Sequence, residues 1–122
     1  MEIQRLNQCL LFDWGDTLMR VFPEFDGPMA SWPKVEVMPH AEEVLSELRP
    51  RTMLAIATNA ADSEEAEIRA ALDRVGLDKL LDKVYCYHRI GHKKPSKEFF
   101  GYILSDLGLE PSQVIMVGDD FE

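Results

Sequence analysis

Four short apolar runs are spaced along the chain, and three longer amphipathic stretches lie between them. Each run is apolar at consecutive positions, which is typical of a strand in a parallel sheet covered on both faces. The predicted strands span residues 8–13, 53–58, 83–87 and 113–119. Because strands and helices alternate, the sequence predicts an α/β fold with a doubly wound, Rossmann-like, mostly parallel sheet.

The amphipathic stretches repeat their apolar residues at the helical period and predict the helices that cover this sheet. They span residues 39–49, 63–75 and 95–107. Asp62 and Glu65 have the spacing of a capping box at the start of the second helix, and Gly108 is expected to end the third. The proline-rich segment 19–38 is too short for a separate domain. We therefore expect one domain over residues 1–122, with 19–38 as a short flap and no large cap domain.

The composition indicates an acidic globular chain. Thirteen lysines and arginines stand against 22 aspartates and glutamates, which gives a formal net charge of −9. This charge repels nucleic acid and anionic membranes, so we expect neither as a partner. No apolar stretch has the roughly 20 residues of a membrane span, and residues 1–7 are too polar for a signal peptide. Cys9 and Cys86 both lie in apolar runs, so we expect reduced thiols and a cytoplasmic location.

Polar residues follow three of the predicted strands, and ligands of open α/β sheets bind at these carboxyl ends. The residues are Asp13 after the first strand, Thr58 and Asn59 after the second, Asp119 and Asp120 after the last, and Lys94 before the third helix. Three carboxylates around one small cavity require a cation, and oxygen ligands suit Mg²⁺. Lys94 and the Thr58 hydroxyl suit a phosphoryl group, and Asp13 is able to attack its phosphorus atom.

Four segments of the chain, in this order, resemble motifs of the haloacid dehalogenase (HAD) superfamily of phosphohydrolases. They are "FDWGDTL", "AIATNA", "HKKPSKEFF" and "IMVGDD", and the resemblance extends over residues 8–122. It implies that the substrate is a small phosphorylated molecule and that the cofactor is Mg²⁺. The family's fold then places the first strand in the centre of the sheet, between the strands at 53–58 and 113–119.

The resemblance also implies a role for each matching residue. Asp13 would be the nucleophile, Thr58 the phosphate-binding hydroxyl, and Lys94 the cation that steadies both. Substrate binding would involve Asp16, Thr17 and Asn59. The metal ligands would be Asp13, the Gly15 backbone carbonyl, Asp119 and Asp120.

One departure from the family pattern concerns Gly15. The family's phosphatases carry a second aspartate at this position as general acid and base, and here Asp16 stands one place too late. General acid–base catalysis contributes about 10²–10⁴-fold to a rate. We therefore expect slow hydrolysis, and the alternative is a non-catalytic HAD-like module that binds phosphate, Mg²⁺ or a protein.

A second departure lies at residue 122, where the family usually continues with an acid, a helix and a strand. We expect the chain to be C-terminally truncated, either as a fragment of a longer protein or as a natural minimal version, and this would leave the strand at 113–119 as an exposed edge. An exposed apolar edge strand is a template for pairing with another chain. This predicts a homo-oligomer joined through the strand at 113–119.

Other residues admit simpler interpretations. His88 and His92 have a spacing that would place two zinc ligands on one helix, but they straddle a strand end and a glycine, which favours surface positions. Trp14 and Trp32 would line the site entrance or belong to the core. Lys93, beside the proposed active-site lysine, is expected to be solvated.

Overall fold

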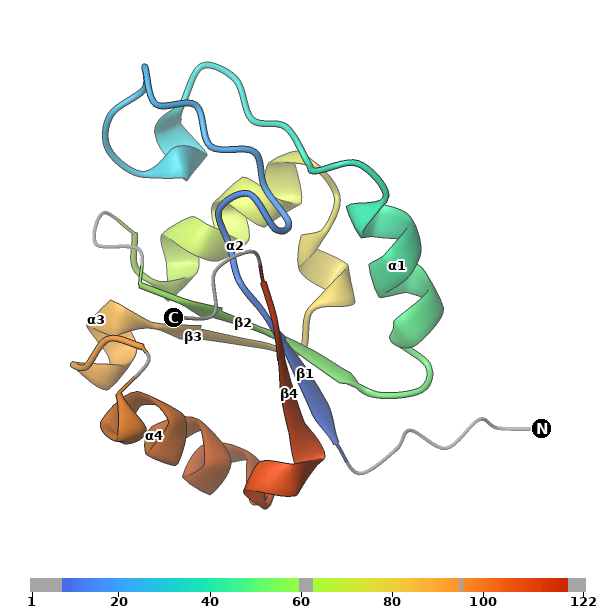
Figure 1. The fold of residues 1–122 in the computed structure, drawn as a ribbon. Coiled ribbons are helices and arrows are strands. Elements are labelled where there is room, and N and C mark those ends of the chain that lie inside the picture. Colours follow the sequence, from blue (N-terminus) through green and yellow to red (C-terminus); the bar gives the residue numbers. More distant parts are fainter. Residues whose placement is uncertain (1–7, 60–62, 95, 119–122) are drawn as a thin grey trace.

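The chain forms a four-stranded sheet in the computed structural model, which describes residues 8–59, 63–94 and 96–118 (Figure 1). The strands are β1 (Cys9–Phe12), β2 (Met53–Thr58), β3 (Lys83–Cys86) and β4 (Val114–Val117). All neighbouring strands are parallel, and their order is β3-β2-β1-β4. The predicted class and the central position of the first strand are thereby confirmed.

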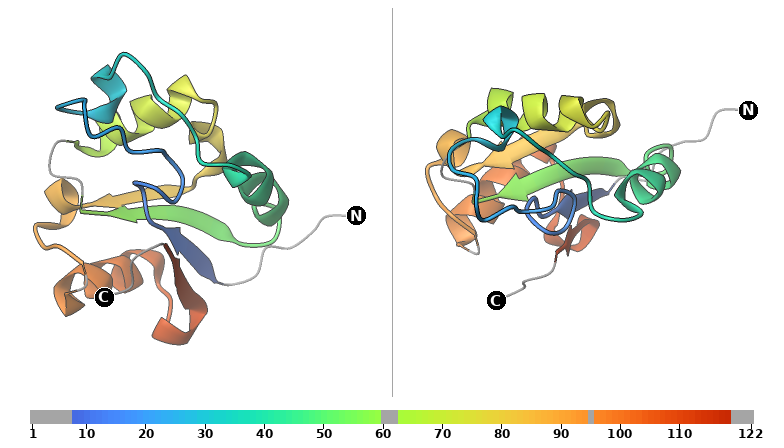
Figure 2. Two further views of the ribbon diagram at one scale, coloured as in Figure 1. Left: turned by 45° about the horizontal axis from the view of Figure 1, so that its top comes forward. Right: turned by 90° about the horizontal axis from the view of Figure 1, so that it is seen from above.

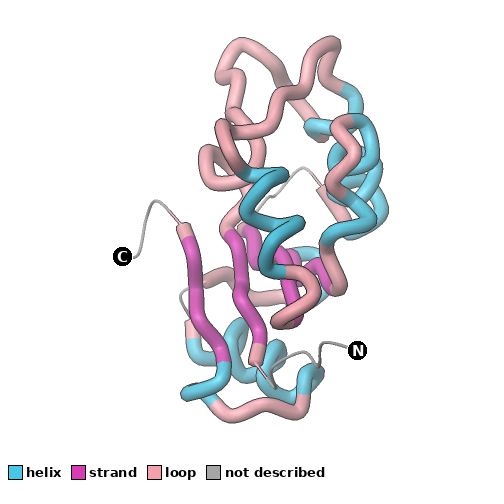
Figure 3. Tube along the Cα trace, turned by 90° about the vertical axis from the view of Figure 1, so that its right-hand side faces the viewer, coloured by secondary structure: helices cyan, strands magenta, loops and turns pink. Residues whose placement is uncertain are grey.

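Helices cover both faces of the sheet. They are α1 (Ala41–Leu48), α2 (Glu65–Arg74), α3 (Tyr87–Ile90) and α4 (Lys97–Leu107), with 3-10 turns at Met29–Ser31, Asp78–Leu80 and Pro111–Gln113. Figure 2 and Figure 3 show α1 and α2 on one side of the strands and α4 on the other. This is the arrangement that right-handed crossovers produce when the strand order reverses. In the described part of the chain, no helix has the length and apolar character to cross a membrane.

Two apolar cores lie on the two faces of the sheet. Phe12, Leu54 and Ile56 point toward α1 and α2, whereas Leu11 and Tyr85 point toward α4. Alternate residues of β1, β2 and β3 therefore belong to different cores, which explains why these runs are apolar at consecutive positions.

Local details of the helices differ from the expectations. The strand predicted to reach residue 87 ends at Cys86, because Tyr87 begins α3. The capping box of α2 uses Glu64 and Glu67 instead of Asp62 and Glu65. Ser96 caps α4 by accepting a hydrogen bond from the Phe99 N–H at 3.1 Å.

The segment 19–38 runs as an extended loop with one 3-10 turn and packs against α2. The Arg74 side chain holds it there by donating hydrogen bonds to the carbonyls of Ala30 and Trp32, at 3.2 and 2.6 Å. Trp32 is partly buried against the core, and Trp14 is buried within it. Trp14 is thus a core residue.

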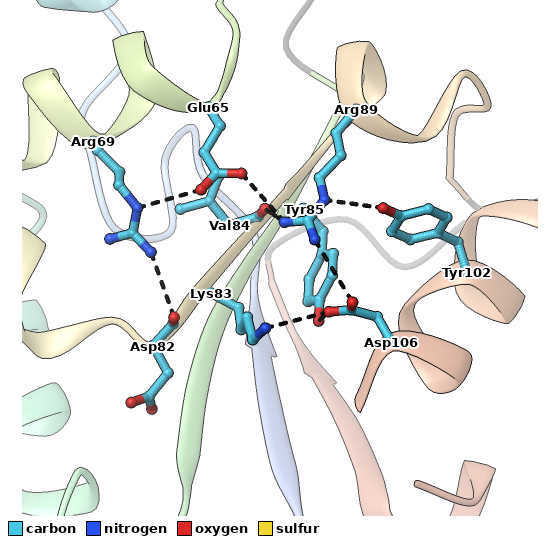
Figure 4. A network of polar contacts seen from close by, with 9 residues as sticks. All are labelled: Glu65, Arg69, Asp82, Lys83, Val84, Tyr85, Arg89, Tyr102 and Asp106. Carbon is cyan, nitrogen blue, oxygen red and sulfur yellow. Dashed lines mark hydrogen bonds and ion pairs between the residues drawn. The ribbon is translucent and has the colours of Figure 1, made fainter. Parts of the chain in front are cut away.

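The two edges of the sheet have different surroundings. Guanidinium groups cover the β3 edge, where Arg69 donates to the Asp82 carbonyl and Arg89 donates to the Val84 carbonyl (Figure 4). At the β4 edge, no side chain among the described residues makes such a contact, and the Ile115 residue is 51% exposed. Charged groups protect edge strands from pairing with other chains, and the described residues provide no such protection for β4.

Candidate active site

Asp13 is the first residue after β1, and two donors fix its carboxylate. Its backbone N–H donates to the Val117 carbonyl at 2.8 Å, which continues the β1–β4 ladder by one residue. Its Oδ1 accepts one hydrogen bond from the Trp14 N–H at 2.9 Å and another from Lys94 Nζ at 2.8 Å. Among the described residues both donors bind Oδ1, so Oδ2 is the carboxylate oxygen left for chemistry.

Lys94 reaches Asp13 from a loop that is 81 residues away in sequence. Its Nζ also donates to the Ala57 carbonyl at 2.7 Å, so the ammonium group bridges β1 and β2. The side chains of Lys94 and Asp13 are only 16% and 19% exposed. A partly buried ion pair of this kind is screened less by solvent than a surface pair, so it holds both groups in place.

Asn59 fixes the backbone of this loop. Its Nδ2 donates to the Lys94 carbonyl at 3.0 Å, and its Oδ1 accepts from the Lys94 N–H at 2.8 Å. The amide side chain is therefore engaged with Lys94, and this positions the lysine. Sequence reasoning assigned Asn59 to substrate binding, and only the fold shows that it pairs with a residue 35 positions away.

Gly118 leaves open space beside the carboxylate. A Cβ atom at this position would lie 3.0 Å from Asp13 Cβ and 3.3 Å from Asp13 Oδ2. Contacts this close are rare, so a side chain at residue 118 would crowd the oxygen that is not held by donors. The sequence placed this glycine at the end of the last strand, before Asp119 and Asp120, but gave it no role of its own.

The loop after Asp13 is tightly turned. Asp16 has a left-handed backbone with φ of 58°, and its Oδ1 accepts a hydrogen bond from the Val21 N–H at 3.1 Å. Its carboxylate thus stabilises the loop and is exposed to solvent. The Thr17 hydroxyl is buried, and no partner for it lies among the described residues. Burying a hydroxyl without a hydrogen-bond partner destabilises the fold. The Thr17 hydroxyl is therefore a candidate for binding a ligand.

Thr58 is the last residue of β2 and is buried, at the carboxyl end of the strand beside β1. The structure therefore brings Asp13, Lys94, Asn59 and Thr58 to one edge of the sheet. Asp119 and Asp120 lie outside the described residues. His88 and His92 are both exposed, and the described residues contain no group of three acidic, histidine or cysteine ligands around a metal position.

The oxygen donors at this edge of the sheet suit Mg²⁺. Asp13 Oδ2 and the backbone carbonyl of Gly15 are hard oxygen donors from one loop, and Mg²⁺ prefers such ligands. Gly118 adds clearance next to Oδ2. These observations fit a hard divalent cation, which would gain its remaining protein ligands from Asp119 and Asp120.

The sequence matches the haloacid dehalogenase-like hydrolase family over residues 11–122. It is 33% identical over 90 residues to the ribulose-1,5-bisphosphate 5-phosphatase of Halopiger xanaduensis, covering 73% of this chain and 36% of that protein. The chain thus spans little more than a third of that relative.

Two solved structures share the fold. An uncharacterized protein from Listeria monocytogenes serotype 4b aligns with a TM-score of 0.77 and 24% identity, over 92% of this chain and 67% of its own. The HAD-hydrolase YfnB from Bacillus subtilis, determined with bound magnesium, aligns with a TM-score of 0.68 and 15% identity. The alignment covers 96% of this chain and 79% of YfnB. At these identities the two structures establish the fold alone.

Proposed function

This chain belongs to the haloacid dehalogenase-like hydrolase family, and on that premise we propose that it is a magnesium-dependent phosphatase with Asp13 as its nucleophile. The observation that supports this best is the asymmetric carboxylate: Trp14 and Lys94 both bind Oδ1, while Gly118 keeps space beside Oδ2. The phosphatase activity for which the Halopiger relative is named adds support for a small phosphate ester as substrate.

In the first step, Asp13 Oδ2 forms a bond with phosphorus, and the bond from phosphorus to the ester oxygen breaks. The ester oxygen leaves with the electron pair, and the product at the enzyme is an aspartyl-phosphate. Lys94 stabilises the charge on the phosphoryl oxygens, with the Thr58 hydroxyl at the next strand end. In the second step, water attacks the phosphorus, phosphate leaves, and the Asp13 carboxylate is restored.

The described residues of this site include no side chain placed to donate a proton to the leaving oxygen. Gly15 provides no acid for the leaving oxygen, and the Asp16 carboxylate is bonded to Val21 within its own loop. The leaving oxygen therefore takes its proton from water, which slows the hydrolysis of esters with basic leaving groups. Activated esters such as p-nitrophenyl phosphate need no such proton.

Mg²⁺, when bound, would neutralise the negative charge that gathers between the nucleophile and the phosphoryl group. Its ligands would be Asp13, the Gly15 carbonyl, Asp119 and Asp120. Asp16 and Thr17 are proposed to contact the substrate from the same loop. A cytoplasmic location agrees with the two cysteines, which are buried in opposite cores, Cys9 on β1 and Cys86 on β3.

The proposal is tested by assaying p-nitrophenyl phosphate with and without Mg²⁺. Asp13→Asn should lower kcat by about 10³-fold or more, because the amide cannot attack phosphorus. Lys94→Gln should lower kcat by about 10²–10³-fold, because a donor to the phosphoryl charge is lost. The control is Asp73→Asn, an exposed carboxylate on α2, which should leave activity unchanged.

Two results would contradict the mechanism. If Asp13→Asn keeps the wild-type rate, another group is the nucleophile. If the wild-type chain hydrolyses neither p-nitrophenyl phosphate nor a panel of phosphorylated metabolites, the alternative of a phosphate-binding or protein-binding module is favoured. Asp16→Asn tests whether Asp16 supplies the missing proton: in that case the variant should lose about 10²-fold in rate on phenyl phosphate, whose leaving oxygen requires a proton, and little on p-nitrophenyl phosphate.

A further inference from the structure

The segment 87–97 has a charge opposite to that of the whole chain. It holds four of the 13 lysines and arginines and two of the three histidines, and it contains no acidic residue. The segment includes α3, the following loop and the first residue of α4, at the end of the sheet where β2 and β3 finish (Figure 1). A chain with a net charge of −9 thus presents a local positive surface beside its candidate active site.

Two of these positive groups are already paired. Arg89 contacts Glu65 at 3.2 Å and Asp106 at 3.7 Å (Figure 4). The hydrogen bond that it donates to the Tyr102 hydroxyl raises the arginine pKa, so its charge is permanent. Lys94 is paired with the nucleophile. Neither group is therefore available for a second ligand group.

Three other basic side chains of this segment, Lys93, His92 and Lys97, are exposed and have no acidic partner in the described part of the chain. The ammonium group of Lys93 lies over an aromatic ring, with its Nζ 5.2 Å from the centre of the Tyr87 ring. A cation over an aromatic ring gains about 0.5–1 kcal/mol at an exposed site. The positive N-terminal end of α4, which is capped by Ser96, adds to the potential of these groups.

The strand register places this surface at a defined position relative to Asp13. Cys86 on β3 lies opposite Thr58 on β2, so Tyr87 follows beside Asn59. Asp13 follows β1, which is two strands from β3. Two strand spacings amount to roughly 10 Å, which a short carbon chain between two anionic groups can bridge.

We propose that Lys93, with His92 and Lys97, forms a second anion subsite that binds the non-reacting acidic group of a phosphate ester with two anionic ends. This inference rests on the proposed phosphatase function, because the reacting phosphoryl group is placed at Asp13. Lys94 and Thr58 bind that phosphoryl group, whereas Lys93 would bind the anionic group at the far end of the substrate. The subsite therefore selects substrates and does not take part in bond breaking.

The test compares two substrates on the full chain in the presence of Mg²⁺: p-nitrophenyl phosphate, with one anionic group, and ribulose 1,5-bisphosphate, with two. Lys93→Gln should raise KM for the bisphosphate about tenfold, because one charge at contact distance is lost. Its kcat should change less than twofold, and KM for p-nitrophenyl phosphate should not change. The tenfold effect should shrink in 0.5 M salt, because exposed charges are screened.

Lys79→Gln is the matched control, since Lys79 is an exposed lysine in the 3-10 turn at the opposite end of β3. It should leave both substrates unaffected. Equal KM changes for the two substrates in Lys93→Gln, or no change for either, would overturn the subsite. Turnover of p-nitrophenyl phosphate without tighter binding of the bisphosphate than of inorganic phosphate would also overturn it, and would leave the proposed phosphatase intact.

If the chain hydrolyses neither substrate, calorimetric titration still tests the subsite separately. Weaker binding of the bisphosphate to Lys93→Gln than to the wild type would support the subsite while the phosphatase proposal fails. Equal binding to the two proteins would overturn it.

Discussion

Restoring a carboxylate at Gly15 tests why this site is expected to be slow. Gly15 does not have a positive φ, so its backbone accepts an aspartate side chain. The obstacle is space, because a Cβ at this position would lie 2.8 Å from Val21 Cγ2. Valine is stiff at χ1, so Gly15→Asp alone would force the loop to move. We therefore expect the single variant to lose about 1–3 kcal/mol of stability from overpacking.

The double variant Gly15→Asp/Val21→Ala removes the clashing methyl group. Val21 is 40% exposed, so its truncation should cost only about 1 kcal/mol or less of buried apolar area. General acid–base catalysis contributes about 10²–10⁴-fold, which is about 3–5 kcal/mol of activation free energy. We expect kcat of the double variant to exceed that of Val21→Ala by at least about 10²-fold.

The choice of substrate makes this assay specific to proton transfer. The gain should be large for phenyl phosphate, whose leaving oxygen requires a proton, and small for p-nitrophenyl phosphate. Gly15→Asn/Val21→Ala is the control, because asparagine matches aspartate in size but cannot donate a proton. If the double aspartate variant folds, binds Mg²⁺ and is no faster than this control on phenyl phosphate, the explanation based on Gly15 is wrong.

Three further predictions concern residues other than the proposed nucleophile and its neighbours. Thr17→Val should raise the free energy of unfolding in urea by up to about 1 kcal/mol, because a buried hydroxyl without a described partner is removed, and it should lower kcat if that hydroxyl serves the substrate. The hydrogen bond from the Tyr85 hydroxyl (2.6 Å) lowers the pKa of Asp106, so this carboxylate stabilises the fold above its unfolded pKa of about 3.9. That stability is lost as the pH falls through the lowered value, and Tyr85→Phe should reduce the acid dependence of unfolding measured by circular dichroism. Finally, we propose that the unprotected β4 edge pairs with a second copy, so light scattering after size exclusion should show a dimer that Ile115→Lys weakens; a wild-type monomer at high concentration would contradict this pairing.

The alternation of strands and helices could be predicted from local sequence, because apolar runs, helical periodicity and turn residues act over a few positions. The same local order predicted the meeting of Asp13, Thr58 and Lys94, since parallel strands bring their carboxyl ends to one edge. Local pattern was weaker at element ends. Asp62 and Glu65 have the spacing of a capping box, but the box is formed by Glu64 and Glu67, whose side chains pair with each other's backbone at the start of α2.

The detailed chemistry of the site depended on contacts between distant residues. Sequence alone indicated that Asp13 and Lys94 meet, but the fold decided that Lys94 and the Trp14 N–H bind the same oxygen. It also decided that Gly118 lies against the other oxygen and that Val21 blocks a side chain at Gly15. Such contacts are set to within an ångström by the register of strands far apart in the chain. A sequence pattern specifies which residues share an edge, whereas the packed tertiary structure fixes which atoms touch.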